Sequence, residues 1–150
     1  MDSSYYANRI TECQAEISNC NNRIVKLEIV IADLGKILTY TTEQCTAYED
    51  KISFYMGKND LMFNSAAVAN VARIFCPQMD ADLTGEECIA VKKHFNDTID
   101  AITIEKSNQS KMLENEQSTL ASLKASLDSC KSSYQYCLRQ EAEMHMSAGK

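Results

Sequence analysis

The fold of this protein is decided by residues 10–55, which read ITECQAEISNCNNRIVKLEIVIADLGKILTYTTEQCTAYEDKISFY. Apolar or small side chains recur along this stretch at alternating steps of three and four residues. They are Ile10, Cys13, Ile17, Cys20, Ile24, Leu27, Ile31, Leu34, Leu38, Thr41, Cys45, Tyr48, Ile52 and Tyr55. This alternation is the heptad pattern of a long helix packed along another helix. We therefore predict a helix over residues 4–57.

A second heptad segment follows from residue 84 to residue 144. A capping box, Thr84 with Glu87 three residues later, predicts where it starts. Its repeating positions are Cys88, Lys92, Phe95, Ile99, Ile102, Lys106, Gln109, Leu113, Glu116, Leu120, Leu123, Leu127, Cys130, Tyr134, Cys137, Glu141 and Met144. Two heptad helices of similar length predict an all-α fold, a long antiparallel two-helix coiled-coil hairpin. One Pro, four Gly and no Trp agree with long helices.

Residues 58–83 interrupt the heptad pattern and predict a short helical lobe at the tip of the hairpin. Residues 61–75 can form a short helix, which Pro77 would end, and residues 78–82 read as a polar turn. We expect a single helical domain over residues 1–150. Its predicted parts are helix one at 4–57, the lobe at 58–83, helix two at 84–144 and a frayed tail at 145–150.

Four of the seven cysteines form two pairs with the same spacing. Cys13 and Cys20 are seven residues apart on helix one, and Cys130 and Cys137 are seven apart on helix two. A hairpin register that faces Cys13 with Cys137 and Cys20 with Cys130 also brings the predicted helix ends together. These pairs are possible disulfides, although ideal coiled-coil layers would separate them by about one helical turn. The alternative is that the cysteines pack as small apolar thiols.

Helix one carries more apolar side chains than one hairpin can bury. Those that lie off the heptad positions are Val25, Ile29, Val30 and Ile37. Exposed apolar area of this size usually marks an interface. We predict that these four residues bind a second hairpin, from this or another chain, and complete a four-helix bundle. The alternative is that Ile104, Met112 and the lobe fold over this surface.

Charge and hydropathy exclude several functional classes. The net charge is −6 with interspersed signs, and no cluster of Lys and Arg suggests nucleic-acid binding. No apolar run approaches the roughly 18 residues of a membrane span. The N-terminus lacks the basic start and apolar core of a secretory signal. We expect a protein that is cytoplasmic, or secreted without a cleaved signal peptide.

Catalytic and metal-binding patterns are missing from the sequence. His94 and His145 are the only histidines, and neither has a metal-ligand partner at helical spacing. We find no Ser, His and Asp set and no Gly-rich phosphate loop. A two-helix hairpin is also expected to lack a pocket of about 300 Å³ or more. We therefore predict a protein that is not an enzyme and holds no cofactor or metal.

The start of the chain, with Tyr5 and Tyr6 followed by Ile and Leu heptads, resembles the Trp-X-Gly hairpin superfamily of type VII secretion substrates. It is most similar to the longer members and to the small helical partners of LXG toxins. Tyr55-Met56-Gly57 stands at the predicted helix-one turn, where that family has Trp-X-Gly. The chain departs from the family in its Tyr, in its longer tip and in having no Tyr-x-x-x-Asp or Tyr-x-x-x-Glu signal near the C-terminus.

The resemblance implies a non-enzymatic helical partner or substrate of a type VII-like secretion system. Such a protein would associate with a toxin or a secretion component. The alternative hypothesis is a disulfide-stapled structural coiled-coil protein of an oxidising compartment. A third possibility is a lipid- or ligand-binding lobe over residues 63–75, for which the sequence shows no polar anchor.

Overall fold

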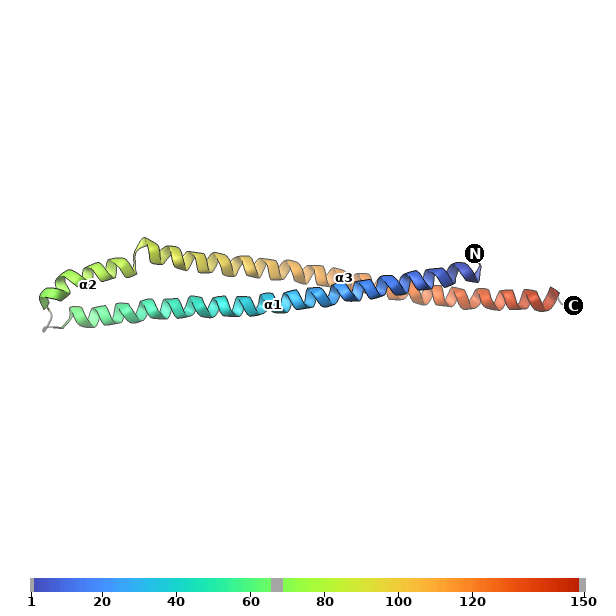
Figure 1. Cartoon of the computed structure of the whole chain (residues 1–150), viewed down its shortest axis with the longest axis horizontal. Coiled ribbons are helices and arrows are strands. Elements are labelled where there is room, and N and C mark those ends of the chain that lie inside the picture. The colour runs from blue at the N-terminus through green and yellow to red at the C-terminus, as the bar shows by residue number, and fades with distance from the viewer. Residues whose placement is uncertain (1, 66–68, 149–150) are drawn as a thin grey trace. The chain divides into compact units, whose positions relative to one another are not determined.

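The computed structural model describes residues 2–65 and 69–148, which form three helices (Figure 1). The helices are α1 (Ser3–Phe63), α2 (Ala69–Leu83) and α3 (Glu86–Ala148). No strand occurs in these two ranges. The long helix α1 packs against α2 and α3, so the predicted all-α helical hairpin is confirmed.

The chain forms two compact units, and α1 and α3 contribute to both. The terminal unit comprises Met1–Ile31 and Asn108–Lys150, and the central unit comprises Ala32–Ser107. In the terminal unit the backbone amide and hydroxyl of Ser3 donate to the Glu141 carboxylate, at 3.0 and 2.8 Å. Further along α1, Cys20 lies against Glu116. Partner numbers fall as α1 numbers rise, so the two helices are antiparallel.

The central unit has the same antiparallel arrangement of α1 and α3. The Tyr48 and Phe95 rings pack with their centroids 6.0 Å apart. The Lys92 ammonium lies 2.7 Å from the Glu49 carboxylate. Near the tip, α2 takes over as the partner of α1, and the Asn59 amide donates to the Cys76 carbonyl and to Asp80, each at 2.8 Å.

The heptad positions form one stripe on each long helix, which we call the seam. On α1 the seam is buried or half-buried from Ile10 to Ile52, and Cys13, Cys20, Ile24 and Cys45 are its most buried members. On α3 the predicted positions are half-buried except for Lys92 and Met144. Because water is excluded mainly along this stripe, apolar burial there is the chief source of stability.

The expected turn at Tyr55 and Gly57 is wrong, because α1 continues through both residues to Phe63. Tyr55 is 53% exposed, and the buried stripe moves to Met56 and Asn59. A glycine inside a helix costs only about 1 kcal/mol relative to Ala. The contacts that Asn59 makes with α2 therefore suffice to keep the helix going.

The expected helix end at Pro77 is also wrong, since Pro77 lies inside α2. The polar turn expected at residues 78–82 is helical. The side-chain amide of Gln78 donates to the Asp82 carboxylate one turn later, at 3.2 Å. Proline removes one ladder hydrogen bond, to the carbonyl of Arg73. Arg73 and Pro77 are both exposed, so water can solvate that carbonyl.

The predicted capping box does not form at the start of α3. The Thr84 hydroxyl donates back to the Asp80 carbonyl at 2.6 Å, which closes the end of α2 instead. The Gly85 carbonyl accepts the first bond of α3, from the Ile89 amide at 3.1 Å. Thr84 is thus used where α2 leaves unpaired carbonyls, which a sequence pattern for helix starts does not anticipate.

The glycines give a matched test of this packing. A Cβ at Gly57 would meet nothing within 4 Å, and one at Gly35 would lie 3.6 Å from the Lys106 ammonium, an ordinary contact. We expect Gly35→Ala and Gly57→Ala each to raise the free energy of unfolding by about 0.5–1 kcal/mol, because Ala loses less entropy in a helix.

At Gly85 a Cβ would lie 2.7 Å from the Ala81 carbonyl oxygen, so Gly85→Ala should lower the free energy of unfolding. Urea unfolding of the three variants, followed by circular dichroism, measures these changes. Equal effects at all three positions would contradict the packing described.

Candidate functional site

The apolar residues predicted as a partner interface lie on the surface. In the terminal unit Val25, Ile29 and Val30 of α1 are exposed, Ile29 by 56%. Ile29 lies on the side of α1 opposite the seam, and Val30 precedes the seam residue Ile31 and so flanks the seam. Because these apolar side chains stay in contact with water, burying them against a partner would be favourable.

The central unit repeats this feature at the equivalent heptad position. Ile37, seven residues after Val30, is exposed and flanks the seam residue Leu38. The same unit has a shallow groove of about 320 Å³ whose lining is almost wholly apolar. Its lining residues are Thr41, Val91, His94, Phe95 and Thr98. A partner side chain could fill this groove as a knob fills a hole.

Within the described residues, Ile104 and Met112 do not fold over this surface. Ile104 in the central unit and Met112 in the terminal unit are themselves mostly exposed. Met112 precedes the seam residue Leu113 on α3, as Val30 precedes Ile31 on α1. In an antiparallel pair these equivalent positions fall on the same flank, so they add to the apolar surface instead of burying it.

The terminal unit contains a polar layer in its seam, made of Cys20, Arg23 and Glu116. The fully buried Cys20 thiol lies 3.3 Å from both the backbone carbonyl and the carboxylate of Glu116. Two Arg23 nitrogens donate to that carboxylate at 3.0 and 3.1 Å. A bidentate pair of this kind has strict geometry. The layer therefore fits only one alignment of α1 along α3.

The three groups shift one another's protonation. Arg23, and next Cys20, holds the pKa of Glu116 below its usual value. Burial raises the pKa of the Cys20 thiol, and the neighbouring Glu116 raises it further. Glu116 is thus ionised at neutral pH while Cys20 stays protonated and donates to it. The heptad pattern predicts Glu116 on the seam but does not identify its partner, because Arg23 is not a heptad position and lies beside the seam.

The register that was predicted from the cysteine spacing is wrong. Cys13 neighbours Cys130, and together with burial this neighbour raises the pKa of the Cys13 thiol. Cys20 faces Glu116 instead of Cys130. Cys137 is seven residues further along α3 than Cys130, roughly 10 Å along the axis, and so beyond the reach of a disulfide to Cys13. None of the seven cysteines, all within the described residues, is in a disulfide.

This register predicts a specific cross-link. Mild oxidation with diamide should join Cys13 to Cys130, because both are seam positions and face each other. Non-reducing peptide mass spectrometry identifies the bridge, and the Cys13→Ser variant is the control that should lose it. A dominant bridge between Cys13 and Cys137 would contradict the register.

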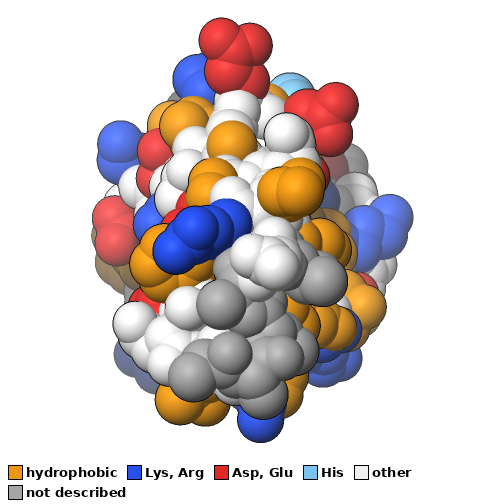
Figure 2. Space-filling view, turned by 90° about the vertical axis from the view of Figure 1, so that its left-hand side faces the viewer, with side chains coloured by type: hydrophobic (Ala, Val, Ile, Leu, Met, Phe, Trp, Pro, Cys, Tyr) orange, Lys and Arg blue, Asp and Glu red, His pale blue; other side chains and the backbone are white. Residues whose placement is uncertain are grey.

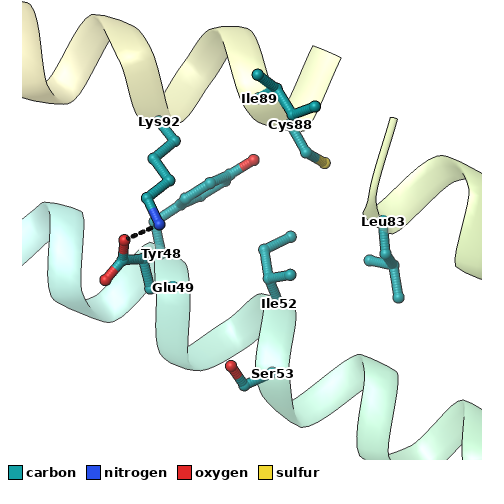
Figure 3. A pocket seen from close by; sticks show the side chains of 8 residues that line it. All are labelled: Tyr48, Glu49, Ile52, Ser53, Leu83, Cys88, Ile89 and Lys92. Atoms are coloured by element: carbon teal, nitrogen blue, oxygen red, sulfur yellow. Dashed lines mark ion pairs between the residues drawn. The ribbon is translucent and has the colours of Figure 1, made fainter. Parts of the chain in front are cut away.

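A pocket of about 350 Å³ lies in the central unit beside the junction of α2 and α3 (Figure 3). It is lined by Tyr48, Glu49, Ile52, Ser53, Leu83, Cys88, Ile89 and Lys92. The expectation that a hairpin has no pocket of this size is therefore wrong. Packing α1 against the α2–α3 corner leaves a space that two straight helices would close.

The polar groups of this pocket are largely engaged with one another. Lys92 pairs with Glu49, which raises the pKa of Lys92. A hydrogen bond with the Cys88 thiol is the main cause that raises the pKa of Tyr48, and the same thiol lies 3.4 Å from the Asp82 carbonyl. Glu49, Lys92, Tyr48 and Cys88 thus each contact a structural partner, which favours a packing role for these side chains.

No group of three or more His, Cys, Asp or Glu side chains in residues 2–65 and 69–148 could hold a metal ion. Among those residues no helix combines the length and apolar character needed to cross a bilayer.

No protein-family model, no curated protein and no solved structure matches this chain.

Proposed function

We propose that this chain is a non-enzymatic helical partner protein that acts by coiled-coil association with a second hairpin. The supporting observation is the exposure of the equivalent flank positions Val30 and Ile37 beside a seam that is already filled. An apolar flank beside a completed seam is the arrangement that a four-helix bundle buries. The resemblance to type VII secretion hairpins suggests a toxin or a secretion component as the partner.

The hairpin would place its seam flank against the flank of the partner. Val30 and Met112 in the terminal unit, and Ile37 with the groove around Phe95 in the central unit, would lose their exposure on binding. Burial of each such side chain contributes roughly 1–2 kcal/mol. This contact would form without breaking a hydrogen bond or an ion pair, and it involves no covalent step.

The test is a pair of charge substitutions with a matched control. Val30→Lys with Ile37→Lys should abolish association, since each places an ammonium in the apolar flank contact. Asn22→Lys with Gln44→Lys makes the same charge change at exposed polar residues of α1 and should leave association intact. Size-exclusion chromatography with light scattering at micromolar concentration measures association. The chain is run alone and together with the protein encoded by the neighbouring gene.

Circular dichroism should show unchanged helix content in both double variants. Unfolding of the Val30→Lys and Ile37→Lys variant would mean that these residues belong to the core of the chain. A wild-type chain that stays monomeric at all concentrations and captures no partner would also refute the proposal.

The alternative function, a disulfide-stapled structural protein, has one supporting observation. Cys13 and Cys130 are neighbours at the open end of the hairpin and could be joined in an oxidising compartment. Mass spectrometry of the chain isolated without reductant separates the two functions. A Cys13–Cys130 bridge formed in the cell would favour the structural role.

A further inference from the structure

Large apolar side chains are exposed at close intervals on the last turns of α1 and on α2. We call this set the tip patch; it consists of Phe54, Tyr55, Leu61, Met62, Phe63, Ile74 and Phe75. Figure 2 views the molecule from the end that carries α2, and it shows apolar side chains on the surface with Lys and Arg side chains among them. The partner interface proposed above uses none of these residues.

The tip patch faces several directions. Near its end α1 packs through Met56 and Asn59, so Phe54 and Leu61 point to the opposite side of that helix. On α2 the packed residues are Ala72 and Cys76, each 1% exposed, and Ile74 points away from them and is 80% exposed. Because α1 and α2 pack against each other, their outer faces point away from each other.

A second copy of the chain could cover only one side of this patch. Seven side chains that each expose about half of roughly 150–250 Å² present on the order of 700 Å², divided between two outer faces. A stable interface needs roughly 800 Å² from each partner, gathered on one face. A rigid partner could contact only one of the two outer faces. An apolar phase that surrounds the end of the hairpin can contact both.

Basic residues beside the tip patch indicate which apolar phase could surround it. The Lys58 ammonium lies 5.4 Å from the centre of the Phe54 ring. Lys58 and Arg73 are exposed, and neither forms an ion pair with any residue in the described ranges. Long basic side chains beside aromatic rings are typical of groups at the headgroup level of a bilayer, where the stem is buried and the charge reaches phosphate.

The charge of the central unit limits the kind of lipid. Residues 32–107 contain seven Lys and Arg and twelve Asp and Glu, a net charge of −5. Attraction to an anionic surface therefore cannot supply the binding energy. We propose that the tip patch inserts into the interfacial layer of a zwitterionic bilayer, driven by burial of its apolar side chains.

The chain contains no Trp, so one substitution introduces a unique fluorescent reporter. Phe54→Trp reports from the tip patch, and Tyr136→Trp, at an exposed aromatic position of the terminal unit, is the control. With phosphatidylcholine vesicles, emission from the tip reporter should shift to the blue and be quenched by brominated lipid, in low and high salt alike. The control reporter should not change.

Flotation with the same vesicles tests the patch without a reporter. The full-length chain should float, and Leu61→Asp with Ile74→Asp should stop flotation without changing the helix content, since both residues are exposed. Tyr136→Asp with Leu138→Asp removes exposed apolar groups elsewhere and should float as the wild type does.

A wild-type chain that stays at the bottom of the gradient would overturn the proposal. So would equal loss of flotation in both double variants, or a tip-reporter shift that depends on protein concentration without lipid, which would assign the patch to a second copy. None of these outcomes bears on the partner interface, whose test uses Val30 and Ile37.

Discussion

Asn59→Asp should destabilise the tip of the hairpin at neutral pH by on the order of 3 kcal/mol. Asn59 is 4% exposed, and its amide nitrogen donates both to the Cys76 carbonyl and to the Asp80 carboxylate. The substitution keeps the shape of the side chain but replaces a shared donor by a carboxylate. Two carboxylates and a carbonyl oxygen would then meet in a buried site with no proton between them.

The effect of Asn59→Asp should depend on pH in a defined direction. The new carboxyl group is buried beside another acid, so it binds a proton more tightly in the folded state than in the unfolded state. Its penalty is therefore full at neutral pH and is relieved as the pH falls, because a protonated carboxyl can donate to Asp80 again.

Asn96→Asp, an identical change at an exposed position of α3, is the control for this variant. Urea unfolding at pH 7 and pH 4.5, followed by circular dichroism, gives the free energies. Hydrogen exchange in residues 59–65 and 69–83 locates the loss. An Asn59→Asp variant as stable as the control at pH 7 would show that α1 and α2 are not held together by this side chain.

Glu116→Lys should lower the unfolding midpoint of the terminal unit by roughly 5–10 °C. The substitution sets an ammonium against Arg23 and removes one of the two acceptors of the buried Cys20 thiol, leaving only the backbone carbonyl. Adding Arg23→Glu should restore part of the loss, because the ion pair is then re-formed with reversed polarity. Glu114→Lys, at an exposed position two residues away, is the control.

Thermal melts of the wild type, Glu116→Lys, Arg23→Glu and the double variant form a double-mutant cycle. A harmless Glu116→Lys substitution would show that the polar layer does not hold the two helices in register. The same would follow if Arg23→Glu failed to rescue a destabilised Glu116→Lys variant. The diamide cross-link adds a second readout, since a slipped register would no longer give a single Cys13–Cys130 bridge.

The pH dependence of the polar layer has the opposite sign to that of Asn59→Asp. The pKa of Glu116 is lower in the folded chain, chiefly because of Arg23. Its contribution to stability is therefore fully present above the unfolded value near 4.5 and is lost as the pH falls through the lower folded pKa. The stability difference between the wild type and Glu116→Gln should be constant above about pH 5.5 and shrink below pH 4.

Few side chains are buried among the residues that the structure describes, which gives single polar contacts unusual weight. A two-helix pair buries one stripe on each helix, and most residues of α1 and α3 are exposed. Two polar clusters, around Asn59 and around Glu116, therefore decide how the helices align, while the apolar seam supplies most of the stability. Such polar layers are costly, and their usual use is to fix register.

The amino-acid sequence by itself determined the two long helices, their seam and the apolar residues left outside it. Steps of three and four residues put the same side chains on one face whatever they pack against, so the half-buried positions from Ile10 to Ile52 and from Phe95 to Glu141 follow from periodicity alone. The exposure of Val25, Ile29, Val30 and Ile37 follows for the same reason. Their role as an interface stays a prediction.

Only the tertiary structure decided the register, the length of α1 and the tip. Sliding one heptad helix along another by seven residues buries the same faces, so the cysteine spacing could not distinguish a Cys137 neighbour for Cys13 from Cys130. The choice depends on a few side chains that interact across the seam, such as Glu116 with Arg23. Likewise Gly57 and Pro77 cost about 1 and 3 kcal/mol inside a helix, yet α1 and α2 continue through them. The contacts of Asn59 with Cys76 and Asp80, which favour this, form only once α1 and α2 have packed.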